Sequence, residues 1–354
     1  GRQARRVSQF HSAGLPSFSF SPHPAEGRRE QAIMDAAQVR VLSVQSHVVH
    51  GYVGNKSAVL PLQVLGIEVD FVNSVQFSNH TGYGTFRGDV LDGDKLWDIV
   101  TGLQTNKLLN HSHLLTGYIG SPSLLRTILR TLAALREVRP DAIYVCDPVL
   151  GDNGKLYVPE DLVQIYREEV LPLATILTPN HFEAELLTDM SITTVDQAFA
   201  ACAALHNQGV HTVVITSASL DASASEEMIT LLASQRHAGA ADGTTPADTR
   251  YRLDIPKIQG SYTGTGDLTA ALILAWTHKL GMDHLAEALE NVIASVQAVI
   301  RRTLHESGAG TELKLVQSVQ DIMDPQVELK LKPLCQSEHA AVSGRSGSPS
   351  GVSG

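Results

Sequence analysis

The segment SYTGTGDLTAALILAWTHK, residues 261–279, places residues that could carry chemistry directly before an apolar run. Gly264 and Gly266 flank Thr265, and glycine lets backbone N–H groups converge because no Cβ obstructs them. The apolar run after Asp267 predicts a buried helix, whose first amides lack intrahelical partners and lie at the positive end of its dipole. The pattern predicts a phosphate site with a carboxylate beside it. The alternative is that Asp267 is only the helix N-cap, a position that Asp favours.

Acidic residues in two other segments could bind a divalent cation. Asp147 and Asp152 lie in DPVLGDNGKLYVPEDL, and Glu183 lies in TPNHFEAELL. Hard oxygen ligands of this kind suit Mg²⁺, usually together with waters and substrate phosphates. The alternative is ordinary turn and capping chemistry, because Asp152-Asn153-Gly154 is a favourable turn and Glu183 falls in a first helical turn. An anion turn, these acids and the absence of the P-loop pattern GxxxxGK[ST] favour a phosphotransferase without a P-loop.

The elements that must position these residues alternate between strands and helices, which predicts an α/β fold with a mostly parallel sheet and helices on both faces. Two β-rich runs, 228–235 and 249–258, flank a loop rich in Gly, Ala and Thr at 238–249, and predict an antiparallel hairpin at one edge. The sequence shows no repeats and no interdomain linker. Strands are expected at 39–44, 68–75, 113–118, 142–148, 174–180 and 212–219, and helices at 55–66, 122–138, 181–189 and 195–209.

Polar residues stand where successive strands are expected to end. In open α/β sheets the carboxyl ends of the strands form the edge at which ligands bind, so these side chains predict one polar ligand site. They are Ser46, Gly117, Tyr118, Asp147, Thr178, Asn180, Thr216 and Ser217.

The composition limits the class of function. A formal net charge of −10 over 354 residues argues against nucleic acid as a partner, since nucleic acid requires clustered Lys and Arg. Three distant cysteines without a CxxC pair favour a reducing compartment and argue against a disulfide framework or a zinc site. No apolar run reaches the roughly 18 residues of a membrane helix. No GxGxxG follows the first strand and no GxSxG is present, which disfavours a Rossmann dehydrogenase and a serine hydrolase.

The two ends of the chain differ in composition from the middle. Residues 1–38 are expected to be a disordered leader or extension, because the first 33 residues are rich in Arg and Ser and carry no acid before Glu26. A transit peptide has this composition; the alternative is a translated leader before a start at Met34, from which a cytoplasmic location would follow. Residues 331–354 are expected to form a flexible tail of low complexity. One domain, 39–330, lies between them.

Several motifs together resemble the pyridoxal kinases of the ribokinase-like superfamily, over about residues 39–330. GTGD alone would indicate only the superfamily, whereas SVQSHVVHGYVGN and NSVQFSNHTGY resemble pyridoxal kinases themselves. The resemblance implies a ribokinase-like fold and transfer of the ATP γ-phosphate to the 5′-hydroxymethyl group of pyridoxal, pyridoxine or pyridoxamine. It also implies Mg²⁺ or another divalent cation, a monovalent cation (K⁺ or Na⁺), and a homodimer with a complete site in each subunit.

The resemblance assigns roles residue by residue. It implies that Asp267 is the catalytic base and that Gly264, Thr265 and Gly266 form the anion hole. It implies that the polar atoms of the pyridine ring meet Ser46, Thr81 and Tyr118. It places on the apolar side of that pocket Val53, Val75 and Phe77, for which core packing is the alternative. His47 and His80 flank the pocket motifs and are kept outside the catalytic set.

The resemblance also divides the other polar residues between the nucleotide and the cations. The nucleotide side is implied to contain Asp147, Asn180, Thr216 and Ser217, with Thr265. The Mg²⁺ side is implied to contain Asp152 and Glu183, and the monovalent-cation side Thr178 and Asp147.

Two other functions stay open at this point. A hydroxymethylpyrimidine kinase would share the fold and a similar alcohol, but a GGAG-type start is expected after its first strand, where this chain reads SVQSHVVHGYVGN. A non-catalytic pyridoxal-phosphate-binding protein would not need a base beside the alcohol, so the intact GTGD argues against it.

Overall fold

The computed structural model describes residues 39–220, 227–237, 248–308, 310 and 312–334. The expected leader, most of the expected loop at 238–249 and the end of the expected tail lie outside the described residues. Within the described residues, every expected strand and helix is present, with bounds that shift by a few residues.

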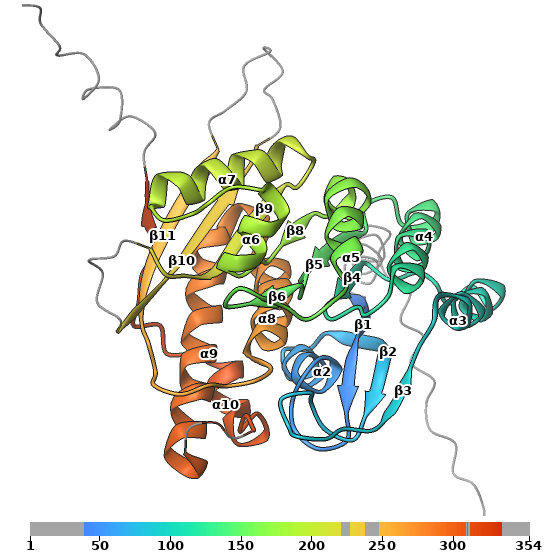
Figure 1. The fold of residues 1–354 in the computed structure, drawn as a ribbon, viewed down its shortest axis with the longest axis horizontal. Helices are drawn as coiled ribbons and strands as arrows, with labels where there is room; N and C mark the ends of the chain where they lie inside the picture. The colour runs from blue at the N-terminus through green and yellow to red at the C-terminus, as the bar shows by residue number, and fades with distance from the viewer. Residues whose placement is uncertain (1–38, 221–226, 238–247, 309, 311, 335–354) are drawn as a thin grey trace, which may run out of the picture. The chain divides into compact units, whose positions relative to one another are not determined.

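A ten-stranded sheet runs through the described part of the chain, in the order β12-β11-β10-β9-β8-β5-β4-β1-β2-β3 (Figure 1). Its six central strands pair in parallel, as the strand–helix alternation predicts. They are β1 (Arg40–Val48), β2 (Glu68–Phe77), β4 (His113–Thr116), β5 (Ile143–Cys146), β8 (Ile176–Leu177) and β9 (Thr212–Ala218).

Successive side chains of these strands enter two different hydrophobic cores, because side chains alternate across a strand. In β4, Leu114 joins one core and Leu115 the other; in β5, Tyr144 and Cys146 join the first core and Val145 the second. One face of the sheet is covered by α3 (Gly93–Thr105), α4 (Pro122–Val138), α5 (Glu160–Ile165), α6 (His181–Thr188) and α7 (Val195–Asn207). The other is covered by α2 (Asn55–Val64), α8 (Thr265–Leu280), α9 (Leu285–Ser307) and α10 (Val319–Met323). The predicted two-sided arrangement is confirmed.

Both edges of the sheet are antiparallel. The expected hairpin is formed by β10 (Met228–Gln235) and β11 (Thr249–Pro256), and β10 also pairs antiparallel with β9. Outside it, the short strand β12 (Lys332–Pro333) pairs with β11, and Leu331 is buried. The folded part of the chain therefore extends beyond residue 330, where the sequence interpretation ended it. At the opposite edge, β3 (Gly88–Val90) pairs with β2, a pairing that the sequence interpretation did not include.

Helix α8 follows the predicted phosphate turn and is buried over residues 268–277. It packs against α9 and α2 as well as the sheet, and a helix that is apolar on all sides requires such a surrounding. Rigid neighbours on every side fix the position of its first turn, where the candidate catalytic residues lie.

Candidate active site at the carboxyl edge of the sheet

Gly264 is the N-cap of α8 and has the left-handed conformation, with φ 87°. A Cβ at this position would lie 1.9 Å from the backbone oxygen of Tyr52, so only glycine fits there. The helix begins at Thr265, which makes Asp267 its third residue. The alternative that Asp267 is the N-cap is therefore wrong, and its carboxyl group lies beside the free amides of the first turn.

The turn before α8 is held by α2, the helix that follows the SVQSHVVHGYVGN motif. The Ser57 hydroxyl donates a hydrogen bond to the Gly264 backbone oxygen, at 2.9 Å. Gly54 precedes α2 with φ 53°, and a Cβ there would lie 2.0 Å from the backbone oxygen of Ser46. Segments more than 200 residues apart in sequence are thus packed backbone against backbone around the start of α8.

Asp267 lies close to the ends of two strands. A Cβ at Gly117, just after β4, would lie 3.3 Å from Oδ1 of Asp267 and 2.6 Å from Oε1 of Gln45. A Cβ at Gly266 would lie 3.6 Å from Oδ2 of Asp147, which follows β5. The structure therefore brings the turn, the carboxyl ends of the strands and β1 together at one edge, as the sequence predicts.

The carboxyl groups at this edge resist ionisation. Burial raises the pKa of Asp267 to about 6, although the Gly54 N–H acts in the opposite direction and the side chain keeps some exposure. The pKa of Asp147 lies well above its usual range, first because the group is buried and then because Glu183 and Asp267 are close enough to repel its charge. A cation or a cation-bound phosphate at this edge would relieve that repulsion.

Glu183 has a structural function that the sequence interpretation gave only as an alternative. Its carboxylate accepts hydrogen bonds from the backbone N–H groups of Leu150 and Asn180, both at 2.9 Å. The Asn180 side chain accepts a hydrogen bond from the Glu183 N–H, which completes a capping box at the start of α6, and it also donates to the Gly151 backbone oxygen. Burial raises the pKa of Glu183 to about 7. This pair holds the turn at residues 150–151 against α6.

Asp152 is exposed, and its carboxylate accepts hydrogen bonds from the backbone and the side chain of Asn153. The turn expected as an alternative is thus present, since Asn153 and Gly154 both have positive φ. Among the residues that the structure describes, no group of three or more His, Cys, Asp or Glu side chains is arranged to hold a metal ion. The donors at this edge fit Mg²⁺ only in its usual mode, with one or two carboxylates and with phosphates and waters as the other ligands.

The donors for a monovalent cation fit better. Oγ1 of Thr178 is buried and faces the buried carboxyl of Asp147, and it makes no hydrogen bond of normal geometry to a described residue. Buried polar atoms without partners are uncommon and call for a ligand or an ion. Further along the edge, Thr216 donates to the Pro179 backbone oxygen, and Ser217 is partly exposed.

The side chains assigned to the substrate ring lie around the ends of β1 and β2. Ser46, Val53 and Val75 are buried, and the burial of the two valines fits core packing as well as an apolar pocket wall. Phe77 is half-buried, and its ring lies 5.0 Å from that of Phe86.

Tyr118 and Thr81 differ in their surroundings. Tyr118 is half-buried, and burial raises the pKa of its hydroxyl. Thr81 is exposed in the loop that joins β2 to β3.

Sequence reasoning missed Asn55, which connects three elements at the start of α2. Its buried side chain accepts a hydrogen bond from Ser43 and donates to the backbone oxygens of Gln45 and Val72. Only the position of Asn55 after a Gly residue at a predicted helix start could have indicated a structural role.

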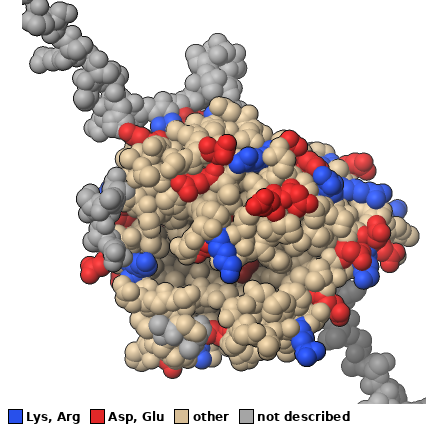
Figure 2. Space-filling model, viewed as in Figure 1, with Lys and Arg blue, Asp and Glu red and all other residues tan. Residues whose placement is uncertain are grey.

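On the face shown in Figure 2, Lys and Arg side chains of the described residues lie scattered among Asp and Glu and form no continuous basic surface. Among the described helices, none has both the length and the apolar character needed to cross a membrane.

The fold and the site define an ATP-dependent phosphotransferase of the ribokinase-like class. A carboxylate at the third position of a helix, a glycine turn before it and further carboxylates at the same sheet edge suit phosphate transfer to an alcohol.

Comparisons with known proteins identify the family. The family model described as phosphomethylpyrimidine kinase matches residues 109–313. Pyridoxal kinase from Arabidopsis thaliana is 50% identical over 299 residues, which cover 82% of this chain and 93% of that protein. Pyridoxal kinase from Homo sapiens is 44% identical over 305 residues, covering 82% and 97%. The structure of pyridoxal kinase from Leishmania donovani with ADP and pyridoxine matches with a TM-score of 0.76 at 36% identity, covering 84% of this chain and 99% of that one. The chain belongs to the pyridoxal kinase family.

Proposed function

We propose that this chain transfers the γ-phosphate of ATP to the 5′-hydroxymethyl group of pyridoxal, pyridoxine or pyridoxamine. The observation that supports it most strongly is the position of Asp267 at the first turn of α8, facing Gly117 and flanked by Asp147. An alcohol placed there would meet a carboxylate and a row of free amides at once.

In the proposed reaction, Asp267 accepts the proton of the substrate alcohol. The O–H bond breaks as the oxygen bonds to the γ-phosphorus, and the bond from phosphorus to the departing ADP oxygen breaks. A pKa of about 6 makes Asp267 a stronger base than a free Asp, whose pKa is about 3.9, while leaving it ionised at neutral pH. The amides of residues 264–267 and the positive end of the α8 dipole stabilise the transferred phosphoryl group.

We propose that the nucleotide lies toward Asp147, Asn180, Thr216 and Ser217, with Thr265 at the transferred phosphate. When bound, Mg²⁺ would neutralise phosphate charge beside Asp147, Asp152 and Glu183. Because both Glu183 oxygens already accept backbone hydrogen bonds, its contact with Mg²⁺ would run through water. A monovalent cation would be bound by the buried Thr178 hydroxyl and the Asp147 carboxylate.

On the substrate side, we propose that Ser46, Thr81 and Tyr118 bind the polar atoms of the pyridine ring. Val53 and Phe77 form the apolar wall, with Val75 behind them.

We propose that the protein works as a homodimer. At the β2–β3 edge, Phe71 and Val90 are 50% and 54% exposed, and an apolar edge of this kind favours cover by a second copy. We propose a cytoplasmic location, because Cys146 and Cys202 are free, buried thiols, as a reducing compartment favours.

A hydroxymethylpyrimidine kinase is the second candidate, since the matching family model carries a related description. The two are separated by incubating the protein with Mg-ATP and either pyridoxal or hydroxymethylpyrimidine, and following ADP release. Release with pyridoxal is expected. Release with hydroxymethylpyrimidine and none with pyridoxal would contradict the proposal, and release with neither would favour the non-catalytic alternative.

A further inference from the structure

The loop between β2 and β3, residues 78–87, carries Thr81, the residue proposed above to bind the pyridine ring; we call it the lid loop. Its two ends are closed by hydrogen bonds from Ser78 N to Arg87 O and from Arg87 N to Ser78 Oγ. From residue 81 to its end it is exposed, so the sheet by itself does not fix the position of its tip.

Glu312, from the segment after α9, holds the tip of the lid loop. Its Oε1 accepts a hydrogen bond from the Tyr83 hydroxyl, at 3.0 Å, and lies 3.3 Å from Nε2 of His80. The Gly82 N–H donates to Nδ1 of His80, which leaves the ring proton on Nε2, facing Glu312. The His80 and Tyr83 rings also pack on each other, with centroids 4.7 Å apart. The two residues bound to Glu312 lie on either side of Thr81 in the sequence.

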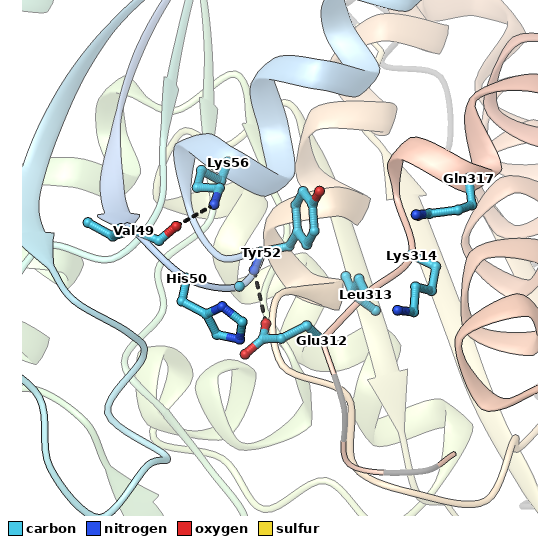
Figure 3. Close-up of a pocket in the computed structure, with 9 residues that line it drawn as sticks. Val49, His50, Tyr52, Lys56, Glu312, Leu313, Lys314 and Gln317 are labelled. Atoms are coloured by element: carbon cyan, nitrogen blue, oxygen red, sulfur yellow. Dashed lines mark hydrogen bonds between the residues drawn. The ribbon is translucent and has the colours of Figure 1, made fainter. Parts of the chain in front are cut away.

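The other oxygen of Glu312 reaches the loop that supports the catalytic turn. Oε2 accepts a hydrogen bond from the Tyr52 N–H, at 3.0 Å, and the Tyr52 backbone oxygen is the atom that excludes a Cβ at Gly264. Gly51 has φ 95°, and a Cβ there would lie 2.2 Å from the same Glu312 oxygen. Figure 3 shows the Glu312 carboxylate below the Tyr52 backbone, at one side of a surface pocket of about 320 Å³.

We propose that Glu312 is a positioning residue that joins the lid loop to the catalytic turn and thereby places Thr81 over the pyridine ring. The Glu312 carboxylate accepts hydrogen bonds from the lid loop and from the loop beside the catalytic turn. Hydrogen bonds to a charged acceptor are stronger than those between neutral groups. The inference rests on the proposed position of the substrate beneath the lid loop. It assigns to Glu312 an effect on the binding of the B6 alcohol and none on the chemistry at Asp267.

The test compares Glu312→Ala, Glu312→Gln and Tyr83→Phe with wild type, using Glu287→Ala, an exposed glutamate of α9, as the matched control. Glu312→Ala is expected to raise KM for pyridoxal roughly ten- to thirtyfold, and Tyr83→Phe roughly three- to tenfold. KM for ATP should stay within about twofold, because Asp147, Asn180 and Thr216 lie at other strand ends. Glu312→Gln keeps one acceptor and should fall between wild type and alanine.

A double variant separates positioning from a general loss of structure. If Glu312 acts through the lid loop, adding Tyr83→Phe to Glu312→Ala should raise KM for pyridoxal little further. The hydrogen bond from the Tyr83 hydroxyl is already lost when Glu312 is replaced by Ala. Direct titration of pyridoxal in the presence of ADP should show the same order of affinities. Phe at position 83 keeps the ring contact with His80 and is expected to fold normally.

Three results would overturn the proposal: an unchanged KM for pyridoxal in Glu312→Ala, an equal rise of both Michaelis constants, or independent effects of the two substitutions. If Glu312→Ala does not fold, Tyr83→Phe decides alone, and an unchanged KM for pyridoxal overturns it. Failure of the proposed function looks different, since wild type itself would then release no ADP with pyridoxal.

Discussion

The catalytic turn and the lid loop flank the same site but are held in different ways. Around Gly264 the contacts are backbone against backbone, with a positive φ and a carbonyl 1.9 Å from the place of a Cβ. The lid loop is exposed at its tip, and the side chains of His80 and Tyr83 hold it through Glu312. The chemical step needs groups fixed to a fraction of an ångström, whereas substrate entry needs a segment that can open.

The difference also appears in the electrostatics. The carboxyls near the turn have raised pKa values because burial penalises their charge, to about 6 for Asp267. In the lid loop, the hydrogen bond to Glu312 raises the pKa of the Tyr83 hydroxyl, and that residue is exposed. Charge at the turn is therefore costly to stability and useful to catalysis, a combination typical of active sites.

The largest effect is expected from removing the base. Asp267→Asn should leave the fold and ATP binding intact and lower kcat roughly 10²–10⁴-fold, the range for loss of a general base. Steady-state ADP release measures the rate, and Asp283→Asn, an exposed position just after α8, is the control. Near-normal turnover of Asp267→Asn would leave this carboxyl with a purely structural role.

A second substitution tests whether the turn depends on backbone packing. Gly264→Ala should lower kcat by about 10²-fold and destabilise the protein by about 2–4 kcal/mol, because the new methyl group meets the Tyr52 carbonyl in addition to backbone strain. Gly66, just after α2, has nearly the same φ, 85°, but open space around it. Gly66→Ala should therefore cost only about 1–2 kcal/mol and leave kcat unchanged. Equal behaviour of the two variants in urea unfolding and turnover would contradict this account.

The pH dependence of the rate should report the raised pKa of Asp267. As the pH falls through about 6, the base becomes protonated, and kcat/KM for pyridoxal should fall with it, tenfold per pH unit at the limit. A profile that stays flat down to pH 5 would exclude Asp267 as the titrating base.

A smaller effect is expected on how the free energy of unfolding depends on pH. Asp267 should make the protein less stable as the pH rises, whereas a carboxylate in an ion pair makes a protein more stable. Because the folded pKa of Asp267 exceeds the unfolded value, the native state binds the proton more tightly. The stabilisation that the protonated Asp267 side chain contributes is fully present below about pH 4 and is lost as the pH rises through about 6. Asp267→Asn, which carries no charge, should thus gain stability relative to wild type at pH 8 and little at pH 4. Urea unfolding at both pH values checks this, and a larger gain at pH 4 would contradict it.

The sequence by itself determined the parallel strands of the sheet and the β10–β11 hairpin, because each carries its own pattern of apolar residues and turn signals. It also determined the phosphate turn, because the glycines of GTGD and the helix that follows them are adjacent in the sequence. It also placed polar residues at the strand ends, since parallel strands bring those ends to one edge.

Only the tertiary structure decided what these residues contact. The sequence could not show that the Tyr52 carbonyl leaves no room for a Cβ at Gly264. Nor could it show that both carboxylate oxygens of Glu183 accept hydrogen bonds from backbone N–H groups. It gave no sign of Glu312, whose donors lie 229 to 260 residues away. Such contacts depend on how helices and loops pack in three dimensions, and a local pattern carries no record of a partner so distant in the chain.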